Sequence, residues 1–77
     1  MIKPTLYEII WKYQTIKFGT VTLKVCDYLE TSFPWLYRDE VVSTNKKVVE
    51  ETAEYLQFIS PEDYKFIVVE KKYDECI

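Results

Sequence analysis

The chain has 77 residues, of which 48% are hydrophobic and 30% charged, and its net charge at neutral pH is −3. It contains one glycine and no histidine, which excludes glycine-rich phosphate-binding loops and every histidine-dependent triad or metal site. The length predicts one small domain over residues 1–77, and the apolar content excludes a disordered chain, which lacks the apolar surface that offsets the entropy of ordering.

The cysteine content and the apolar runs bear on the compartment. The chain carries only Cys26 and Cys76, whereas small secreted domains usually carry four or more cysteines. No apolar signal core opens the chain, and no uncharged run approaches the roughly 20 residues that a membrane helix needs. We therefore expect a cytoplasmic protein without membrane association, with two free thiols in preference to one disulfide.

The first segment, residues 5–13, fits two kinds of element. Thr5 and Glu8 form a capping-box pattern, and the apolar residues at positions 6, 9, 10 and 13 have helical spacing. The alternation of apolar residues from position 7 to 13 also fits a strand. We predict the helix.

The clearest strand pattern follows at residues 15–25. Val21, Leu23 and Val25 alternate there with polar residues, and Gly19 marks a bend or bulge. We expect residues 29–33 to return as a second strand that ends at Pro34, which has no backbone donor. Residues 35–42 fit no single element.

The strongest helix pattern covers residues 46–58, after three potential capping residues at positions 43–45. Pro61 predicts one further helical turn, residues 64–72 predict a strand, and residues 73–77 a frayed tail. Together these elements predict an α+β domain in which two helices pack on one face of a three-stranded, mainly antiparallel sheet. A mostly helical fold is the alternative.

Carboxylates are the remaining candidates for catalysis. Glu50 and Glu54 lie one helical turn apart, with Glu51 beside them. Paired carboxylates act as acid and base only when a cleft removes them from water, and the helical periodicity places these three on the solvent side. We therefore predict no enzymatic activity, no catalytic residue, no cofactor and no metal site.

The segment from residue 50 to 63 contains five acidic residues and no basic one, namely Glu50, Glu51, Glu54, Glu62 and Asp63. A surface of this charge can occupy the basic groove of a protein that handles nucleic acid. The alternative is a solvated surface without a partner. Trp35 and Tyr37 are candidate anchors for the same partner, because Trp and Tyr dominate binding hot spots, although a small core also needs such rings.

A different hypothesis concerns the strip from Lys12 to Lys24. Lysines are interleaved there with Trp11, Tyr13 and Phe18, and aromatic rings beside cations bind single-stranded nucleic acid. The alternative is that the aromatic residues form the core and the lysines the outer surface. The net acidic charge also weighs against direct nucleic-acid binding.

Lysine outnumbers arginine nine to one, and alanine occurs once. This bias favours A/T-rich codons and suggests an A/T-rich bacterium, a phage or an archaeal virus as the source, with a phage or mobile-element protein as the first hypothesis. The first hypothesis is a non-enzymatic protein-binding module, an inhibitor or adaptor of a host nucleic-acid-handling protein that binds through the acidic helix face. The second is a small nucleic-acid-binding regulator using the Lys12–Lys24 strip, and the third is a homodimeric structural protein.

Overall fold

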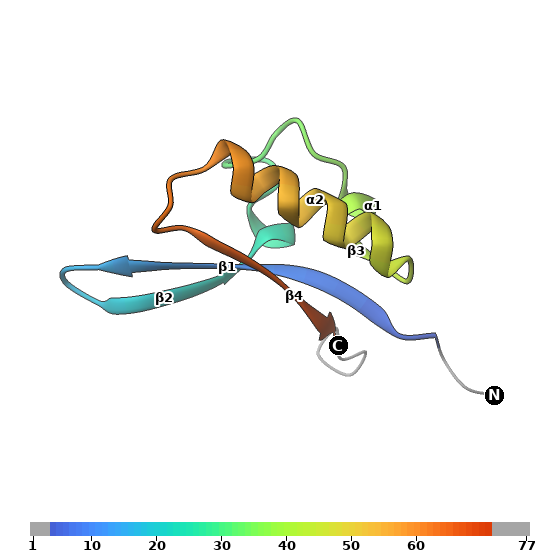
Figure 1. Ribbon diagram of the computed structural model, residues 1–77, viewed down its shortest axis with the longest axis horizontal. Coiled ribbons are helices and arrows are strands. Elements are labelled where there is room, and N and C mark those ends of the chain that lie inside the picture. The colour runs from blue at the N-terminus through green and yellow to red at the C-terminus, as the bar shows by residue number, and fades with distance from the viewer. Residues whose placement is uncertain (1–3, 72–77) are drawn as a thin grey trace.

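The computed structural model of the protein describes residues 4–71. In chain order its elements are β1 (Leu6–Thr15), β2 (Gly19–Lys24), the 3₁₀ turn η1 (Val25–Tyr28), α1 (Arg38–Val41), β3 (Val42–Ser43), α2 (Lys46–Ile59) and β4 (Lys65–Lys71). Figure 1 shows the strands in one layer with the helices on one side of it. The predicted α+β class, with helices on one face of an antiparallel sheet, is confirmed.

The strand β1 is the centre of the sheet. β4 pairs with one edge of β1 over residues 6–12, while β2 and β3 share the other edge, β2 beside residues 10–15 and β3 beside residues 7–8. All three pairings are antiparallel. Because β2 and β3 follow each other along one edge, the four strands form a sheet that is three strands wide.

The predicted helix at residues 5–13 is wrong, because this segment is the central strand β1. A short isolated helix has little intrinsic stability, whereas this segment is paired with neighbouring strands on both edges. Its alternate residues from Tyr7 to Tyr13 face the helices, and Ile9 among them has no exposed surface. Pairing with distant segments therefore outweighs the local helical pattern.

The predicted strand at residues 29–33 is also wrong. After η1 the chain makes turns instead, in which the backbone amides of Ser32 and Phe33 both donate to the Tyr28 carbonyl oxygen, at 2.8 and 3.2 Å. The edge of β1 beyond β2 is occupied by β3. Within residues 4–71 the outer edge of β2, where the predicted strand would pair, has no neighbouring strand.

The helix and the strand predicted for the second half of the chain are confirmed as α2 and β4. Val49 and Leu56 of α2 are fully buried against the sheet. In place of the helical turn predicted after Pro61, the chain makes a hydrogen-bonded turn in which the Tyr64 amide donates to the Pro61 carbonyl oxygen at 3.0 Å. The predicted frayed tail at residues 73–77 lies outside the described residues.

Trp11 is the centre of an aromatic cluster between the sheet and the helical layer. The centroid of its ring lies 5.2 to 6.3 Å from the centroids of five other rings, those of Tyr13, Tyr28, Phe33, Tyr64 and Phe66. Rings at this spacing pack favourably in tilted or edge-to-face geometry. The indole Nε1 is buried without a hydrogen-bond partner, so the contribution of Trp11 to stability comes from its apolar packing.

Candidate functional site

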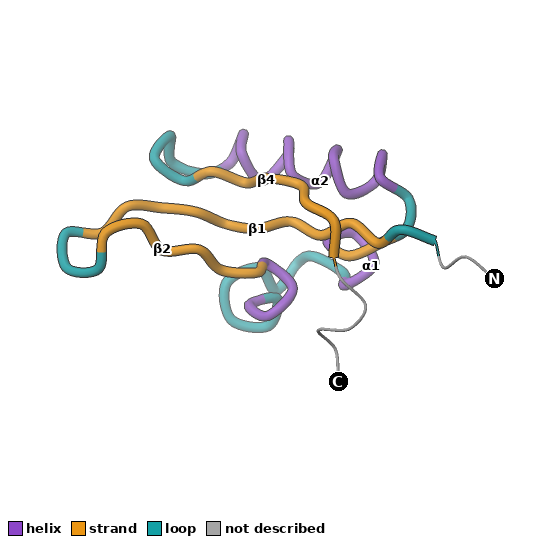
Figure 2. The backbone as a smooth tube through the Cα atoms, turned by 90° about the horizontal axis from the view of Figure 1, so that it is seen from below, coloured by secondary structure: helices purple, strands orange, loops and turns teal. Residues whose placement is uncertain are grey.

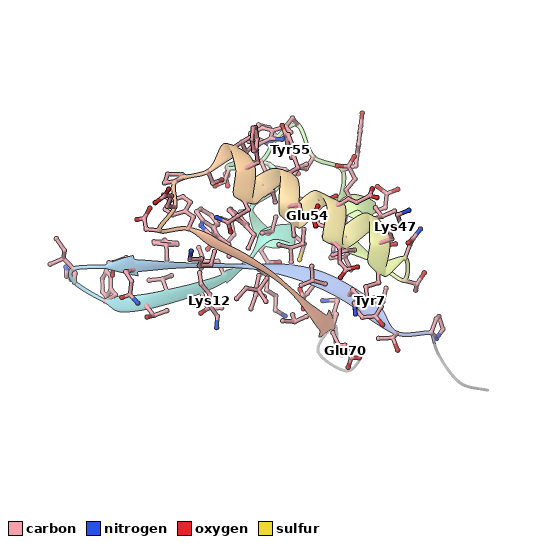
Figure 3. All side chains as sticks on the ribbon, in the orientation of Figure 1. Tyr7, Lys12, Lys47, Glu54, Tyr55 and Glu70 are labelled. Carbon is pink, nitrogen blue, oxygen red and sulfur yellow. The ribbon has the colours of Figure 1, made fainter. Side chains whose placement is uncertain are left out.

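The lysines of the three long strands lie on one face of the sheet. Lys12 stands directly opposite Lys65, Lys24 opposite Ile10, and Lys71 opposite Leu6. Directly opposed residues point to the same side of an antiparallel sheet, and that side is the one without helices. Lys12 projects below the sheet, away from α2 (Figure 3). We call the set Lys12, Lys24, Lys65 and Lys71 the lysine face.

The strip from Lys12 to Lys24 is divided between the two faces of the sheet. Trp11 and Tyr13 point into the aromatic cluster, whereas Lys12 lies on the opposite side. Phe18 is exposed at the tip of the β1–β2 hairpin, where the Lys17 Nζ lies 5.4 Å from the centroid of its ring. The predicted arrangement of Trp11 and Tyr13 as stacking platforms beside these lysines is therefore wrong.

The outer face of α2 combines carboxylates with aromatic rings. Glu51 and Glu54 are exposed, as predicted, and Phe58, one turn after Glu54, is 89% exposed. Tyr55 is half-exposed and points upward from the helix in Figure 3. We call Glu51, Glu54, Tyr55 and Phe58 the outer face of α2.

The other predicted partner-binding residues lie at three different places. Glu62 and Asp63 are exposed in the turn between α2 and β4. Trp35 and Tyr37 are 50% and 72% exposed, in the loop between η1 and α1. In Figure 2 that loop lies on the β2 side of β1, whereas β4 and α2 lie together on the other side of β1. The aromatic loop is therefore apart from Glu50, which lines the groove between α2 and β4.

Trp35 is both a core residue and a surface residue. The centroid of its ring lies 5.8 Å from that of the buried Phe33, in edge-to-face geometry, while half of the side chain remains in contact with solvent. Tyr37 has most of its surface exposed. Of the two predicted anchors, Tyr37 is therefore the one that is available to a partner without any change in core packing.

A groove of about 460 Å³ runs between α2 and β4. Its walls are Glu50, Ala53, Glu54 and Gln57 of α2 and Phe66, Ile67 and Val68 of β4, and we call it the β4 groove. Gln57 closes one end, since its Nε2 donates to the Tyr64 carbonyl oxygen at 2.7 Å and its Oε1 accepts from the Phe66 amide at 3.2 Å. The groove thus has an apolar floor and two carboxylates on its helical wall.

Cys26 occupies a buried position where β2 ends. Its Sγ lies 3.7 Å from Asp27 Oδ1 and 4.0 Å from Glu8 Oε1, and Glu8 itself is only 3% exposed. Burial raises the pKa of the Cys26 thiol, and the carboxylates of Asp27 and Glu8 raise it further. Since the thiolate is the reactive form, Cys26 is a packing group at neutral pH, as the sequence predicted. Cys76 lies outside the described residues.

Three surface features were not predicted from the sequence, namely the β4 groove, the exposed ring of Phe58 and the exposed side chain of Ile16. The β4 groove depends on where α2 packs relative to the edge of the sheet, and no local sequence pattern predicts this packing position. Phe58 had a detectable pattern, because it lies two residues from Leu56 and therefore on the opposite side of the helix from the buried stripe. Ile16 and Phe18 at the hairpin tip are exposed apolar residues as well.

Comparison with models of protein families, with curated proteins and with solved structures gives no significant match. Within residues 4–71, no helix has both the length and the apolar content needed to cross a membrane. In the same part of the chain, no three acidic or cysteine side chains gather as potential metal ligands. The functional conclusion therefore rests on the surfaces described above.

Proposed function

We propose that this protein is a non-enzymatic protein-binding module whose partner presents a basic surface to α2. Proteins that handle nucleic acid carry basic grooves of this kind. We therefore propose a host nucleic-acid-handling protein as the partner, and the role of a stoichiometric inhibitor or adaptor. The observation that carries this proposal is the outer face of α2, where exposed aromatic rings lie among carboxylates.

Phe58 is the side chain that most favours this function. Burying a phenylalanine contributes about 1.5–3 kcal/mol, and in the free protein this side chain is 89% exposed. Glu54 lies one turn before it and Glu62 four residues after it. An aromatic anchor with a polar rim around it is typical of a protein–protein interface, and the carboxylates would steer a basic partner toward it.

The test is the capture of partner proteins from host lysate by the tagged full chain, with nuclease present. We expect one partner in a stoichiometric complex. The triple variant Glu50→Gln, Glu51→Gln, Glu54→Gln and the single variant Phe58→Ala should each lose that partner, because the first removes the charge and the second the apolar anchor.

The matched control is Glu30→Gln, Asp39→Asn, Glu40→Gln, which changes the net charge by the same amount in α1 and the loop before it. This control should retain the partner. Retention by the α2 variants would contradict the proposed surface. Loss of every captured protein on nuclease treatment would contradict the protein-binding function.

The lysine face supports a second candidate function, the binding of a nucleic-acid backbone. Lys12 and Lys65 are directly opposed, and like charges in this position destabilise a sheet, so a bound polyanion would relieve their repulsion. We expect salt-dependent retention on single-stranded oligonucleotides that the double variant Lys12→Gln, Lys65→Gln loses. Equal retention of this variant, or no retention of the natural protein at low salt, would dismiss the candidate.

A further inference from the structure

We propose that the β4 groove binds an extended basic segment of the partner, and that this segment joins the sheet as a new strand beside β4. The proposal deepens the proposed function, on which it rests, by naming the mode of recognition. Three observations carry it: the hydrogen-bonding pattern of β4, the lining of the groove, and the charge on its helical wall.

β4 is an edge strand within the described residues, since it pairs only with β1. In an antiparallel pair, alternate residues turn both backbone groups toward the neighbour, and the residues between them turn both groups away. The Phe66 amide donates to Gln57 on the outer side, so Phe66, Val68 and Glu70 are the outward residues. The backbone N–H and C=O groups of Val68 and Glu70 therefore face the open edge.

The side chain of Gln57 already makes, at the start of this edge, the hydrogen bonds that an added strand would make there. Its side-chain amide donates to the Tyr64 carbonyl oxygen and accepts from the Phe66 amide. This is the pair of hydrogen bonds that one residue of an added parallel strand makes. Gln57 thus satisfies the beginning of β4 and leaves Val68 and Glu70 as the part of the edge that an added strand can use.

The groove determines which side chains the added strand carries toward the helix. Ala53 is small and nearly buried, so it leaves space above Phe66 and Val68 for a long side chain. Glu50 and Glu54 line the same groove. A lysine or arginine fits both features, because its methylene stem covers the apolar floor while its charged end reaches the carboxylates. The segment is therefore extended, with basic residues at alternate positions.

A second copy of this chain fits the groove less well. In an antiparallel pairing of two β4 strands, the helix-facing side chains of both strands lie on the same side of the joined sheet. Those of β4 are Phe66, Val68 and Glu70. Within residues 65–71, the helix-facing side chains of a second copy would bring no cation to Glu50 and Glu54, and Glu70 would add a carboxylate. Charge complementarity thus favours a basic segment of another protein.

The probe is a seven-residue peptide with blocked ends in which valine and lysine alternate, added to the full chain at low salt. Amide hydrogen exchange read by NMR is the measurement. We expect exchange at Val68 and Glu70 to slow by about ten-fold or more on saturation, because each amide gains a hydrogen bond. Ile67 and Val69 donate to β1 and should exchange slowly with or without peptide.

Two controls identify the mode of binding. The same peptide with alternate backbone amides methylated cannot form the edge hydrogen bonds and should bind at least about ten-fold more weakly. The double variant Glu50→Gln, Glu54→Gln should weaken the unmodified peptide several-fold, whereas Glu30→Gln, Asp39→Asn should not.

Val68→Pro removes the backbone N–H of residue 68, which faces the open edge, and leaves the hydrogen bonds between β4 and β1 in place. Edge strands tolerate proline at such a position. This variant should not bind the peptide. If this variant does not fold, the methylated peptide tests the same hydrogen bonds. Binding that leaves exchange at Val68 and Glu70 unchanged, or equal binding of the methylated peptide, would overturn strand addition. Strand addition by a partner would also be overturned if sedimentation shows that the protein forms a dimer through β4 and this dimer does not bind the peptide.

These outcomes are separable from those of the proposed function. A partner captured through the outer face of α2 and retained by Val68→Pro leaves the protein-binding function intact and removes the added strand. Peptide binding in the groove by a protein whose Phe58→Ala variant still captures its partner removes the outer face of α2 as the proposed site and leaves the groove, because Phe58 does not line the groove.

Discussion

The two faces of β1 are built from alternate residues of one ten-residue strand, yet they have opposite characters. The face toward the helices carries Ile9 and Trp11 and is packed against the core. The face away from them carries Lys12 opposite Lys65. The helical layer above is acidic at its surface, with Glu51 and Glu54 exposed. A net charge of −3 thus conceals two surfaces of opposite sign, so each has to be tested separately.

Alanine substitutions at the neighbouring residues Trp11 and Lys12 should differ most in their effect on the free energy of unfolding. Trp11→Ala removes the centre of the aromatic cluster and should cost about 3–5 kcal/mol of unfolding free energy, which leaves so small a domain largely unfolded. Lys12→Ala should change stability by about 0.5 kcal/mol or less. Urea denaturation measures both. A similar cost for the two variants would contradict the division of the strand into a core face and a surface face.

The same contrast exists within α2, between Leu56 and Phe58. Leu56 has no exposed surface, so Leu56→Ala should cost about 2–5 kcal/mol. Phe58→Ala should cost about 0.5 kcal/mol or less, because this side chain is almost fully exposed. Thermal unfolding of the two variants is the measurement. Marked destabilisation by Phe58→Ala would mean that the ring has a structural role, and it would remove the main support for the binding surface.

Cys26 tests whether the core is closed to solvent at η1, where this buried thiol lies. The pKa of its thiol is raised by burial and then by the carboxylates of Asp27 and Glu8, so the folded protein holds the proton more tightly than the unfolded chain. At pH 8, iodoacetamide should modify Cys26 at least about ten-fold more slowly in the native protein than in urea. Mass spectrometry distinguishes it from Cys76. Equal rates would show that the thiol is open to solvent.

The raised pKa of the Cys26 thiol also determines how the stability of the protein depends on pH. The raised pKa of Cys26 means that its contribution to stability is complete below the ordinary thiol pKa. As the pH rises toward the folded-state pKa, the unfolded chain loses this proton first and the free energy of unfolding falls. Cys26→Ala should reduce the alkaline loss of stability relative to the natural protein.

The smallest expected effect concerns the opposed lysines. Lys65→Glu replaces a like-charge pair with an opposite-charge pair across β1 and β4, and it should raise the free energy of unfolding by about 0.2–1 kcal/mol. Added salt should reduce the difference between the two proteins by screening both pairs. A decrease in stability at low salt would show that Lys65 has a favourable partner that outweighs Lys12.

The sequence determined the elements whose patterns are local. Val21 and Leu23 alternate with polar residues and form β2, and Val49 and Leu56 repeat at helical spacing and form α2. Both elements were predictable because the apolar face implied by the pattern is the one that the fold buries. The exposure of Glu50, Glu51 and Glu54 followed from the same helical phase. Together these elements were sufficient for the α+β class.

Only the tertiary structure decided the rest, because it depends on contacts between residues far apart in the chain. Residues 5–13 satisfy two periodicities, and β2, β3 and β4 select the strand by pairing with both of its edges. The register with those strands, and not any local pattern, brings Lys12 opposite Lys65. The β4 groove exists because α2 packs beside the open edge of β4, and no local sequence pattern encodes that placement.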